Sequence, residues 1–172
     1  TYGWTVGVCG TILKTTDSGF NWATQVSEVE NDFNSVDFID QNIGWIVGDD
    51  GVLLQTTDGG LNWITQSSNT VFSLNSICFT DNQTGWTVGA YGTLLRTTNA
   101  GESWISQSSG TFEILRSVFF IDNQTGWVVG NNGIILKTVD AGVNWQVQTS
   151  GTNKILYSVQ FVDEKSGWAV GE

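Results

Sequence analysis

Apolar and polar residues alternate along short segments of this chain, and clusters of Gly, Asn, Asp and Ser separate the segments. Residues 34–39 (NSVDFI) carry apolar side chains at alternate positions, as expected for a strand with one buried face. Segments 44–48 (GWIVG), 52–57 (VLLQTT) and 63–67 (WITQS) follow, each after a polar turn. β-branched and aromatic residues between turn residues are typical of strands. No segment keeps a 3.6-residue period, so we expect four strands in this stretch and almost no helix.

This four-strand pattern recurs every 41 residues, as the dipeptide Gly-Trp shows at Gly3, Gly44, Gly85, Gly126 and Gly167. A second marker, T-(T/V)-(D/N)-x-G-x-x-W, keeps the same register in four repeats. A period near 40 with several short strands per unit indicates a β-propeller. We therefore predict an all-β fold, an arc of about four four-stranded antiparallel blades that belongs to a larger ring or assembly. Residues 1–172 form one repeat domain, with repeats at 3–43, 44–84, 85–125 and 126–166 and a partial repeat at 167–172.

The second marker predicts a turn in which each residue type has its own role. The side chain of Asp or Asn accepts hydrogen bonds from backbone N–H groups of the turn that it begins. The Gly tolerates positive φ, and the Trp packs the hairpin against its neighbour. Because Asn99 replaces the acid in the third repeat, we interpret the series as structural, not catalytic or metal-binding. Its residues are Asp17, Gly19, Trp22, Asp58, Gly60, Trp63, Asn99, Gly101, Trp104, Asp140, Gly142 and Trp145.

These motifs resemble the bacterial neuraminidase (Asp-box) repeat, Ser/Thr-x-Asp-x-Gly-x-x-Trp. Within that group, the unit GW-x-VG…G-x-(I/L)-L-x-T-T-(D/N)-x-G-x-x-W is most similar to the repeat of photosystem II assembly and stability factors. The resemblance covers all four periods and implies a propeller, usually of about six to eight blades. It implies no single function, because Asp-box propellers include glycosidases, receptors, assembly factors and secreted surface modules.

The ends of the chain fall within blades. The chain starts just before a second strand and stops after another second strand, so we expect three complete blades between a first blade without its inner strand and a fifth with two strands. Open strand edges promote aggregation, so we expect neighbouring sequence or another copy to cover both ends. The chain has no methionine and no signal peptide, from which we expect a processed chain or a piece of a longer one.

Composition excludes several classes of partner. The chain has 17 acidic and 6 basic residues and a net charge of −11, which disfavours binding to nucleic acids and to anionic membrane surfaces. No apolar run reaches the roughly 18 residues of a membrane helix. Histidine is absent, and Cys9 and Cys78 have neither metal-binding nor disulfide spacing. We expect no cofactor and no metal.

Catalytic groups are not evident in the sequence. Sialidases of this repeat family use an arginine cluster and a Tyr–Glu pair, whereas this chain has only Arg96 and Arg116, at different repeat positions. Xyloglucanases of the family need two opposed carboxylates, and the acids available here lie in loops. We therefore predict that the chain is not an enzyme. The resemblance to photosystem assembly factors implies a basic patch, from which this acidic chain departs.

Two sets of loops vary between repeats: the turn after the second strand and the crossover that follows the outer strand. In a propeller both sets lie on the face opposite the Asp-box turns, and variable loops on a rigid scaffold are where binding usually occurs. The first two repeats contain ten acidic residues and one basic residue, which favours an acidic face for a basic partner, a Ca²⁺ site or a solvated surface. The candidate interaction face comprises Glu28, Glu30, Asp32, Asp49, Asp50, Tyr91, Asn131 and Asn132.

Two further interpretations stay open. Asn82 and Asn123 begin Asn-x-Thr sequons in equivalent turns, which indicates either glycosylation or simply polar turns. For function, we expect a non-catalytic secreted or cell-surface module, a structural or protein-interaction scaffold that binds a protein partner or other copies or blades at its open ends. The alternatives are a glycan-binding propeller in which Tyr91 stacks on sugars, part of a glycosidase, and a photosystem assembly factor-like protein.

Overall fold

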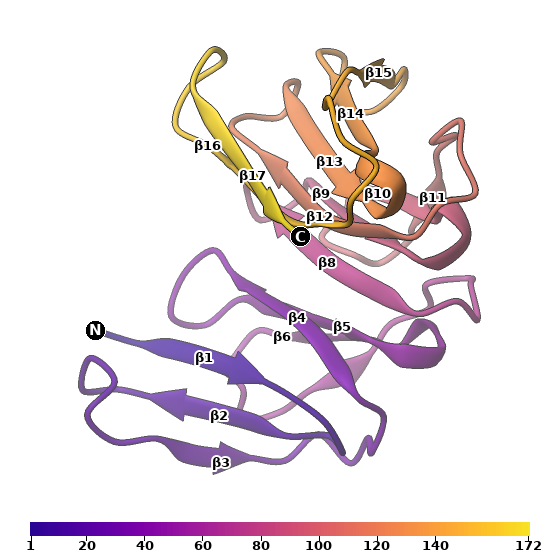
Figure 1. The fold of residues 1–172 in the computed structure, drawn as a ribbon. Coiled ribbons are helices and arrows are strands. Elements are labelled where there is room, and N and C mark those ends of the chain that lie inside the picture. Colours follow the sequence, from indigo (N-terminus) through magenta and orange to yellow (C-terminus); the bar gives the residue numbers. More distant parts are fainter.

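The computed structural model describes residues 1–172 as five antiparallel sheets that follow one another along an arc (Figure 1). Neighbours within each sheet are consecutive strands, so each sheet is a meander. Blade 1 comprises β1 (Gly3–Val6), β2 (Ile12–Thr15) and β3 (Ala23–Gln25). Blade 2 comprises β4 (Phe33–Phe38), β5 (Gly44–Gly48), β6 (Leu53–Thr56) and β7 (Ile64–Thr65). Blade 3 comprises β8 (Leu74–Phe79), β9 (Gly85–Gly89), β10 (Leu94–Thr97) and β11 (Ile105–Ser106). Blade 4 comprises β12 (Leu115–Phe120), β13 (Gly126–Gly130), β14 (Ile135–Thr138) and β15 (Gln146–Gln148), and blade 5 comprises β16 (Leu156–Phe161) and β17 (Gly167–Gly171).

This architecture confirms the predicted propeller arc, with three complete blades between two partial ones. Helix is limited to single 3₁₀ turns after the second strands: η1 (Asp49–Gly51), η2 (Ala90–Gly92) and η3 (Asn131–Gly133). None of the helices has the length and apolar character needed to cross a bilayer. The outer strands are shorter than predicted, although the Gln66 N–H still donates to the Leu53 carbonyl at 2.9 Å.

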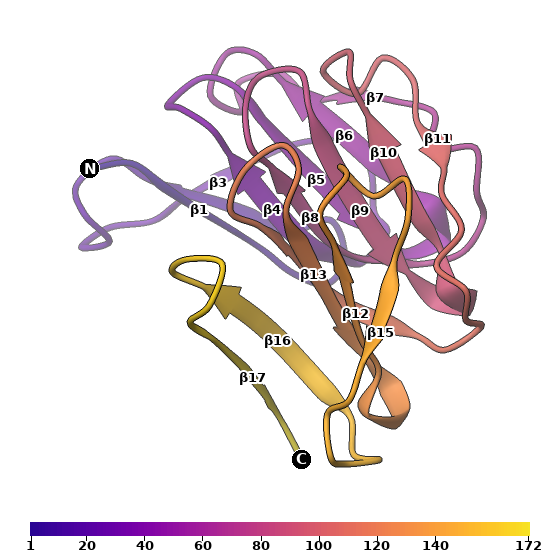
Figure 2. The ribbon, with the colours of Figure 1, turned by 90° about the horizontal axis from the view of Figure 1, so that it is seen from above.

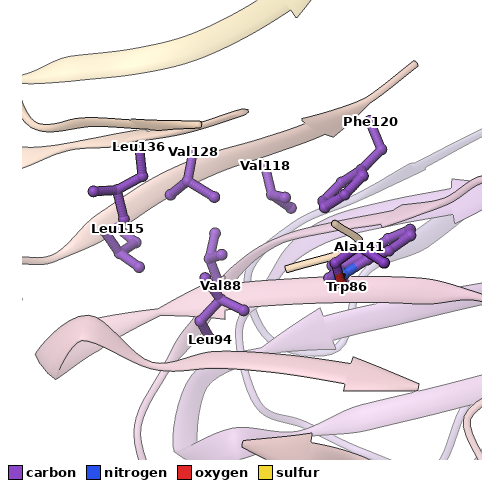
Figure 3. Close-up of a cluster of buried hydrophobic side chains, with 9 residues drawn as sticks. All are labelled: Trp86, Val88, Leu94, Leu115, Val118, Phe120, Val128, Leu136 and Ala141. Atoms are coloured by element: carbon purple, nitrogen blue, oxygen red, sulfur yellow. The ribbon is translucent and has the colours of Figure 1, made fainter. Parts of the chain in front are cut away.

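The hydrophobic core lies between the blades, in clusters that each combine residues from two neighbours (Figure 3). An aromatic stack recurs at these interfaces. The ring of Trp45 in blade 2 lies 3.5 Å from that of Phe79 in blade 3, with 6° between their planes, and Trp104 meets Phe79 edge-on at 5.9 Å. The Trp45 indole N–H donates to the Ala100 carbonyl at 3.0 Å. The same stack joins Trp4 to Phe38, Trp86 to Phe120 and Trp127 to Phe161.

The glycine of each Gly-Trp pair makes room for this stack. Gly85 pairs with Phe79 across β9 and β8, and a Cβ atom at Gly85 would lie 2.7 Å from the Phe79 ring. Only glycine therefore lets the phenylalanine fold over the strand and reach the tryptophan of the preceding blade. The Gly-Trp dipeptide recurs in the sequence because this packing recurs in successive blades.

Inner strands of successive blades lie side by side, as Figure 2 shows for β4, β8 and β12. Their free backbone edges are covered by side chains of the preceding blade. Ser35 Oγ accepts the Ile77 N–H at 3.3 Å, and Asp37 Oδ2 accepts the Phe79 N–H at 2.6 Å. Ser76 and Ser117 do the same for Val118 and Val159. Backbone groups that a sheet edge would leave unpaired are thus satisfied across the blade boundary.

The Asp-boxes lie in turns between third and fourth strands, as predicted. In blade 2, Asp58 Oδ1 accepts the Asn62 N–H and the Thr56 hydroxyl, both at 2.9 Å, and Gly60 has a φ of 85°. Asp58 Oδ2 also accepts from Asn62 Nδ2 at 2.7 Å. The third repeat forms the same turn with Asn99 in place of the aspartate and Ser103 in place of the asparagine. There, Asn99 Nδ2 donates to Ser103 Oγ at 3.0 Å. Asn at the first position is therefore matched by Ser four residues later.

Substitutions in the Asp-box of blade 2 test this coupling. Asp58→Asn directs an amide NH₂ at the NH₂ of Asn62, so we expect a loss of no more than about 1 kcal/mol in the free energy of unfolding. Adding Asn62→Ser reproduces the third repeat and should recover most of that loss. Trp63→Ala removes the ring that meets Phe38 edge-on at 5.9 Å and should cost about 3–5 kcal/mol.

Urea unfolding of the three variants and the parent chain measures these differences. A loss for Asp58→Asn equal to that for Trp63→Ala contradicts the assignment of the acid as a turn former. A double variant no more stable than Asp58→Asn alone contradicts the coupling to residue 62.

Candidate functional site

Hydrogen bonds place the variable loops together on one face of the arc. The turns after the second strands bind the preceding crossovers: the Asp49 N–H donates to Asp32 O and the Ala90 N–H to Ser73 O, each at 2.9 Å. We call the surface formed by η1–η3, the equivalent turn of blade 1, and the crossovers 27–33, 67–74, 108–115 and 149–156 the crossover face. The Asp-box turns instead bind the turns between first and second strands, as in Gly59 N–H to Asn42 O at 2.8 Å. These turns make up the opposite, Asp-box face.

The predicted acidic residues lie on the crossover face, and three of them are held by neighbouring loops. Asp32 Oδ1 accepts the Cys9 N–H at 2.9 Å. Asp49 Oδ1 accepts from Asn34 Nδ2 at 2.9 Å, and Asp50 Oδ2 from Asn31 Nδ2 at 3.0 Å. Glu28 and Glu30 are exposed on the first crossover. No group of three or more His, Cys, Asp or Glu side chains gathers in a way that could hold a metal ion, and calcium binding stays a prediction.

The other predicted residues of this face each have a partner that the sequence analysis did not select. Tyr91 is exposed, and its ring lies 4.7 Å from that of Phe72. Asn132 Nδ2 donates to Glu113 Oε1 at 2.8 Å. Phe72 and Glu113 are themselves related by the 41-residue shift, as are Tyr91 and Asn132. The repeat alignment marks these positions as variable, but their pairing depends on how crossovers and turns meet in space.

Asn131, the remaining predicted residue of this face, accepts a hydrogen bond from an arginine side chain of the same chain. Asn131 Oδ1 accepts from Arg116 Nε at 3.0 Å, and the Arg116 guanidinium lies 5.8 Å from the centre of the Tyr157 ring. The other arginine, Arg96, lies on β10 with its guanidinium 5.9 Å from the Trp86 ring. The two arginines thus lie at different positions in neighbouring blades, and each makes a cation–π contact with a different aromatic ring.

A buried acid lies between the inner strands and was not predicted as a site. Burial raises the pKa of Asp37 above its ordinary value of 3.8, although the Phe79 and Phe38 backbone N–H groups oppose the shift. Burial, together with the nearby charge of Asp37, raises the pKa of the Cys78 thiol to about 12. The thiol therefore stays protonated at neutral pH and is a poor nucleophile. Asp37 therefore joins blades 2 and 3, whereas Cys78 packs against the hydrophobic cluster between blades 3 and 4.

The sequon residues lie on the Asp-box face, in turns that join first and second strands. Asn82 is exposed. Asn123 is already engaged, because its Nδ2 donates to Asp81 Oδ2 at 2.7 Å and its Oδ1 accepts from the Thr80 hydroxyl. These contacts join the turns of blades 3 and 4. Glycosylation of either residue stays a prediction.

An aspartate at the start of each of these turns accepts backbone hydrogen bonds from the turn, a repeated feature that the sequence analysis missed. Asp81 Oδ1 accepts the N–H groups of Gln83 and Thr84, both at 2.7 Å. Hydrogen bonds from the turn lower the pKa of this carboxyl, against a raising effect of burial. The signal was available, since an acid stands at this position every 41 residues: Asp40, Asp81, Asp122 and Asp163.

The comparisons with known proteins agree with this architecture. A family model described as Photosynthesis system II assembly factor YCF48 matches residues 1–70, 22–110 and 63–150. No curated protein matches the chain. A solved structure of YCF48 bound to a D1 peptide is similar, with 18% identity and a TM-score of 0.56 over 99% of this chain and 87% of that one.

Two further solved structures share the fold. YCF48 from Cyanidioschyzon merolae has 16% identity and a TM-score of 0.60, over 99% of this chain and 76% of that one. A GH74 enzyme from Niastella koreensis has 14% identity and a TM-score of 0.70, over 92% of this chain but 29% of the enzyme. At these identities the likeness establishes the propeller fold alone, and this chain spans less than a third of the enzyme.

Stability as a function of pH tests the buried acid. Because the pKa of Asp37 is raised on folding, its contribution to stability is present below about pH 4 and is lost as the pH rises through the folded-state pKa. Asp37→Asn keeps an acceptor for the Phe79 N–H and removes the charge. We expect the variant to be more stable than the parent chain at about pH 7, and the gain to vanish near pH 4.

Urea unfolding at both pH values measures this gain. The Asp-box acids have the opposite sign, since hydrogen bonds lower their pKa, to about 2 for Asp17, so their contribution is lost in acid. They are present in both proteins and cancel in the comparison. A gain of the same size at both pH values contradicts an ionised, buried Asp37.

Proposed function

The chain belongs to the Photosynthesis system II assembly factor YCF48 family, and from this premise we propose that it is a non-catalytic propeller scaffold that binds a protein partner on its crossover face. The family description names an assembly role, and one solved relative is bound to a peptide. Both support a protein partner over a small-molecule substrate.

One observation carries the proposal: the repeats keep their stacking residues, while equivalent positions on the crossover face differ in chemistry from blade to blade. The side chains that pair there are Asn with Asp in blade 2, Phe with Tyr in blade 3 and Glu with Asn in blade 4. These pairs occupy equivalent positions on equivalent backbones. A rigid frame with a different side-chain chemistry on each blade is what recognition of an extended partner requires.

The charge of the face supports a basic partner. Glu28, Glu30, Asp32, Asp49 and Asp50 all lie on it, and no lysine or arginine occurs between Lys14 and Arg96. Long-range attraction by such a face accelerates association with a basic partner more than it raises final affinity. The acidic face also separates this chain from assembly factors that use a basic patch.

A photosystem-directed assembly role is the second candidate, and the family description favours it. One solved YCF48 structure contains a bound D1 peptide. Our proposal for this acidic chain does not extend to that peptide. A secreted or cell-surface location, expected from the sequence, stays a prediction. The hydrogen bonds that Asp32, Asp49 and Asp50 accept from neighbouring segments account for their place on the face without a glycosidase role.

Selection of random linear peptides displayed on phage tests the proposed function. Bound peptides are then measured against two modified chains in a Cys9→Ser background. Val71→Cys lies on the crossover face and Leu61→Cys on the Asp-box face, where the native side chains are 78% and 75% exposed. Each new thiol carries a bulky polyethylene glycol attached through maleimide, whereas the half-buried Cys78 thiol, whose pKa is raised to about 12, reacts far more slowly.

We expect the polymer on residue 71 to weaken peptide binding by about tenfold or more, and the polymer on residue 61 to leave it unchanged. Selection of no binding peptide overturns the proposal, and so does equal weakening by both polymers. Hydrolysis of a sialoside or a β-glucan by the parent chain overturns its non-catalytic part.

A further inference from the structure

The crossover face of blade 3 differs from its neighbours in one pair of side chains. In blades 2 and 4 the crossover residue and the middle residue of the turn are polar and joined by hydrogen bonds of 3.0 and 2.8 Å. In blade 3 the equivalent residues are Phe72 and Tyr91, whose ring centres lie 4.7 Å apart with a tilt of 35° between the rings. Both rings remain in contact with solvent, with exposed fractions of 42% and 67%.

The fold itself does not favour a tyrosine at this turn. Tyr91 has a φ of 54°, in the left-handed region where Asn and Asp are well tolerated and bulky residues are strained. Asp50 and Asn132 take the equivalent positions with φ values of 57° and 54°. Blade 1 has the small Cys9 here at a φ of 53°, so Tyr91 is the only bulky residue among the four turns, and its strain points to a role outside folding.

The aromatic pair is part of a longer apolar strip. An open hollow of about 550 Å³ runs along residues 66–72, and Val71 beside Phe72 is 78% exposed. On the other side of Tyr91, the Gly92 N–H donates to the Glu113 carbonyl at 2.9 Å, which holds the next crossover against the turn. Phe112 on that crossover is 89% exposed. Apolar side chains therefore appear on three adjoining segments of one face.

Acidic side chains stand on both sides of the strip. Toward blade 2, Ser68 Oγ donates to the Gly51 carbonyl at 2.6 Å, so the crossover that carries Val71 and Phe72 lies against the turn that carries Asp49 and Asp50. Toward blade 4 lies Glu113, which is bound to Asn132. Arg116 follows Glu113 closely in the sequence, but its Nε–H donates a hydrogen bond to Asn131 Oδ1.

We propose that the strip formed by Val71, Phe72, Tyr91 and Phe112 is the docking site for a linear segment of a partner protein that carries an aromatic side chain between lysines or arginines. This inference rests on the proposed function and specifies the partner of the same face. The aromatic side chain of the segment packs on Phe72 and Tyr91, and its cations meet Asp50, Glu113 and the face of the Tyr91 ring. Sugars also stack on exposed tyrosines and donate hydroxyl hydrogen bonds to carboxylates, but a neutral sugar lacks the charge attraction that acids on both sides of the ring offer a cationic segment.

A labelled synthetic peptide with one tryptophan between two pairs of lysines is the probe. Two matched peptides carry alanine in place of the tryptophan or glutamates in place of the lysines. Phe72→Asn with Tyr91→Asn removes the aromatic pair and installs the residue found at Asn31 and Asn132. Asp49→Asn with Asp50→Asn converts the turn of blade 2 into that of blade 4. The control, Phe20→Asn, changes a side chain that is 87% exposed on the Asp-box face.

Fluorescence anisotropy at low and high salt measures binding, and thermal unfolding verifies that each variant is folded. We expect loss of the aromatic pair to weaken binding by about tenfold or more at both salt concentrations. Loss of the two acids should weaken it by about three- to tenfold at low salt only, because salt screens exposed charges. The control should bind as the parent chain does, and both matched peptides should bind more weakly.

Equal binding by the parent chain and the folded aromatic-pair variant overturns the docking site. Binding of a β-glucan oligosaccharide that requires Tyr91, without binding of the basic peptide, overturns it in favour of a glycan. Should phage selection yield peptides that need the crossover face but are insensitive to Phe72→Asn with Tyr91→Asn, the docking site fails and the proposed function stands. Should selection yield no peptide while the basic probe also fails to bind, both fail.

Discussion

The stack between a tryptophan of one blade and a phenylalanine of the next is the interaction on which the rest of the structure depends. At 3.5 Å between the rings of Trp45 and Phe79, it fixes how closely two twisted sheets approach. It requires glycine opposite the phenylalanine, and it positions the indole N–H to bind the Asp-box turn of the following blade at Ala100. One contact thus joins the Gly-Trp motif and the Asp-box, two features separated along the chain.

The repeat made the fold accessible from sequence, since each feature was visible four times in the same register. Strand order, the turns at the Asp-boxes and the number of strands in each blade depend on local chemistry, which a repeating sequence displays directly. The exchange of Asp58 with Asn62 for Asn99 with Ser103 was also visible, but its meaning depends on which side-chain atoms face each other. Likewise, the variation at residues 72 and 91 was apparent, whereas their stacking depends on contact between segments that lie 19 residues apart.

The division between scaffold and recognition surface has a physical basis. Stacking, indole hydrogen bonds and the serines that cover strand edges all lie between blades or on the inner strands, away from the crossover tips. Residues at the tips, such as Asp50, Tyr91 and Asn132, share one backbone geometry and differ in charge, size and polarity. The same fold occurs in a YCF48 structure and in a GH74 enzyme, so the fold alone does not decide function.

The stacking contacts between blades have a fixed head-to-tail order, with the tryptophan on one blade and the phenylalanine on the next. Blades 2 and 3 each offer a tryptophan ring, an indole donor and a serine oxygen to the next blade, which contributes a phenylalanine ring, a carbonyl group and a strand-edge N–H. Such a head-to-tail interface contains no information about how many units precede or follow it. Duplication or loss of a whole 41-residue unit in the gene leaves every remaining junction chemically complete, so proteins of this kind are free to change length by whole blades while each tip diverges separately.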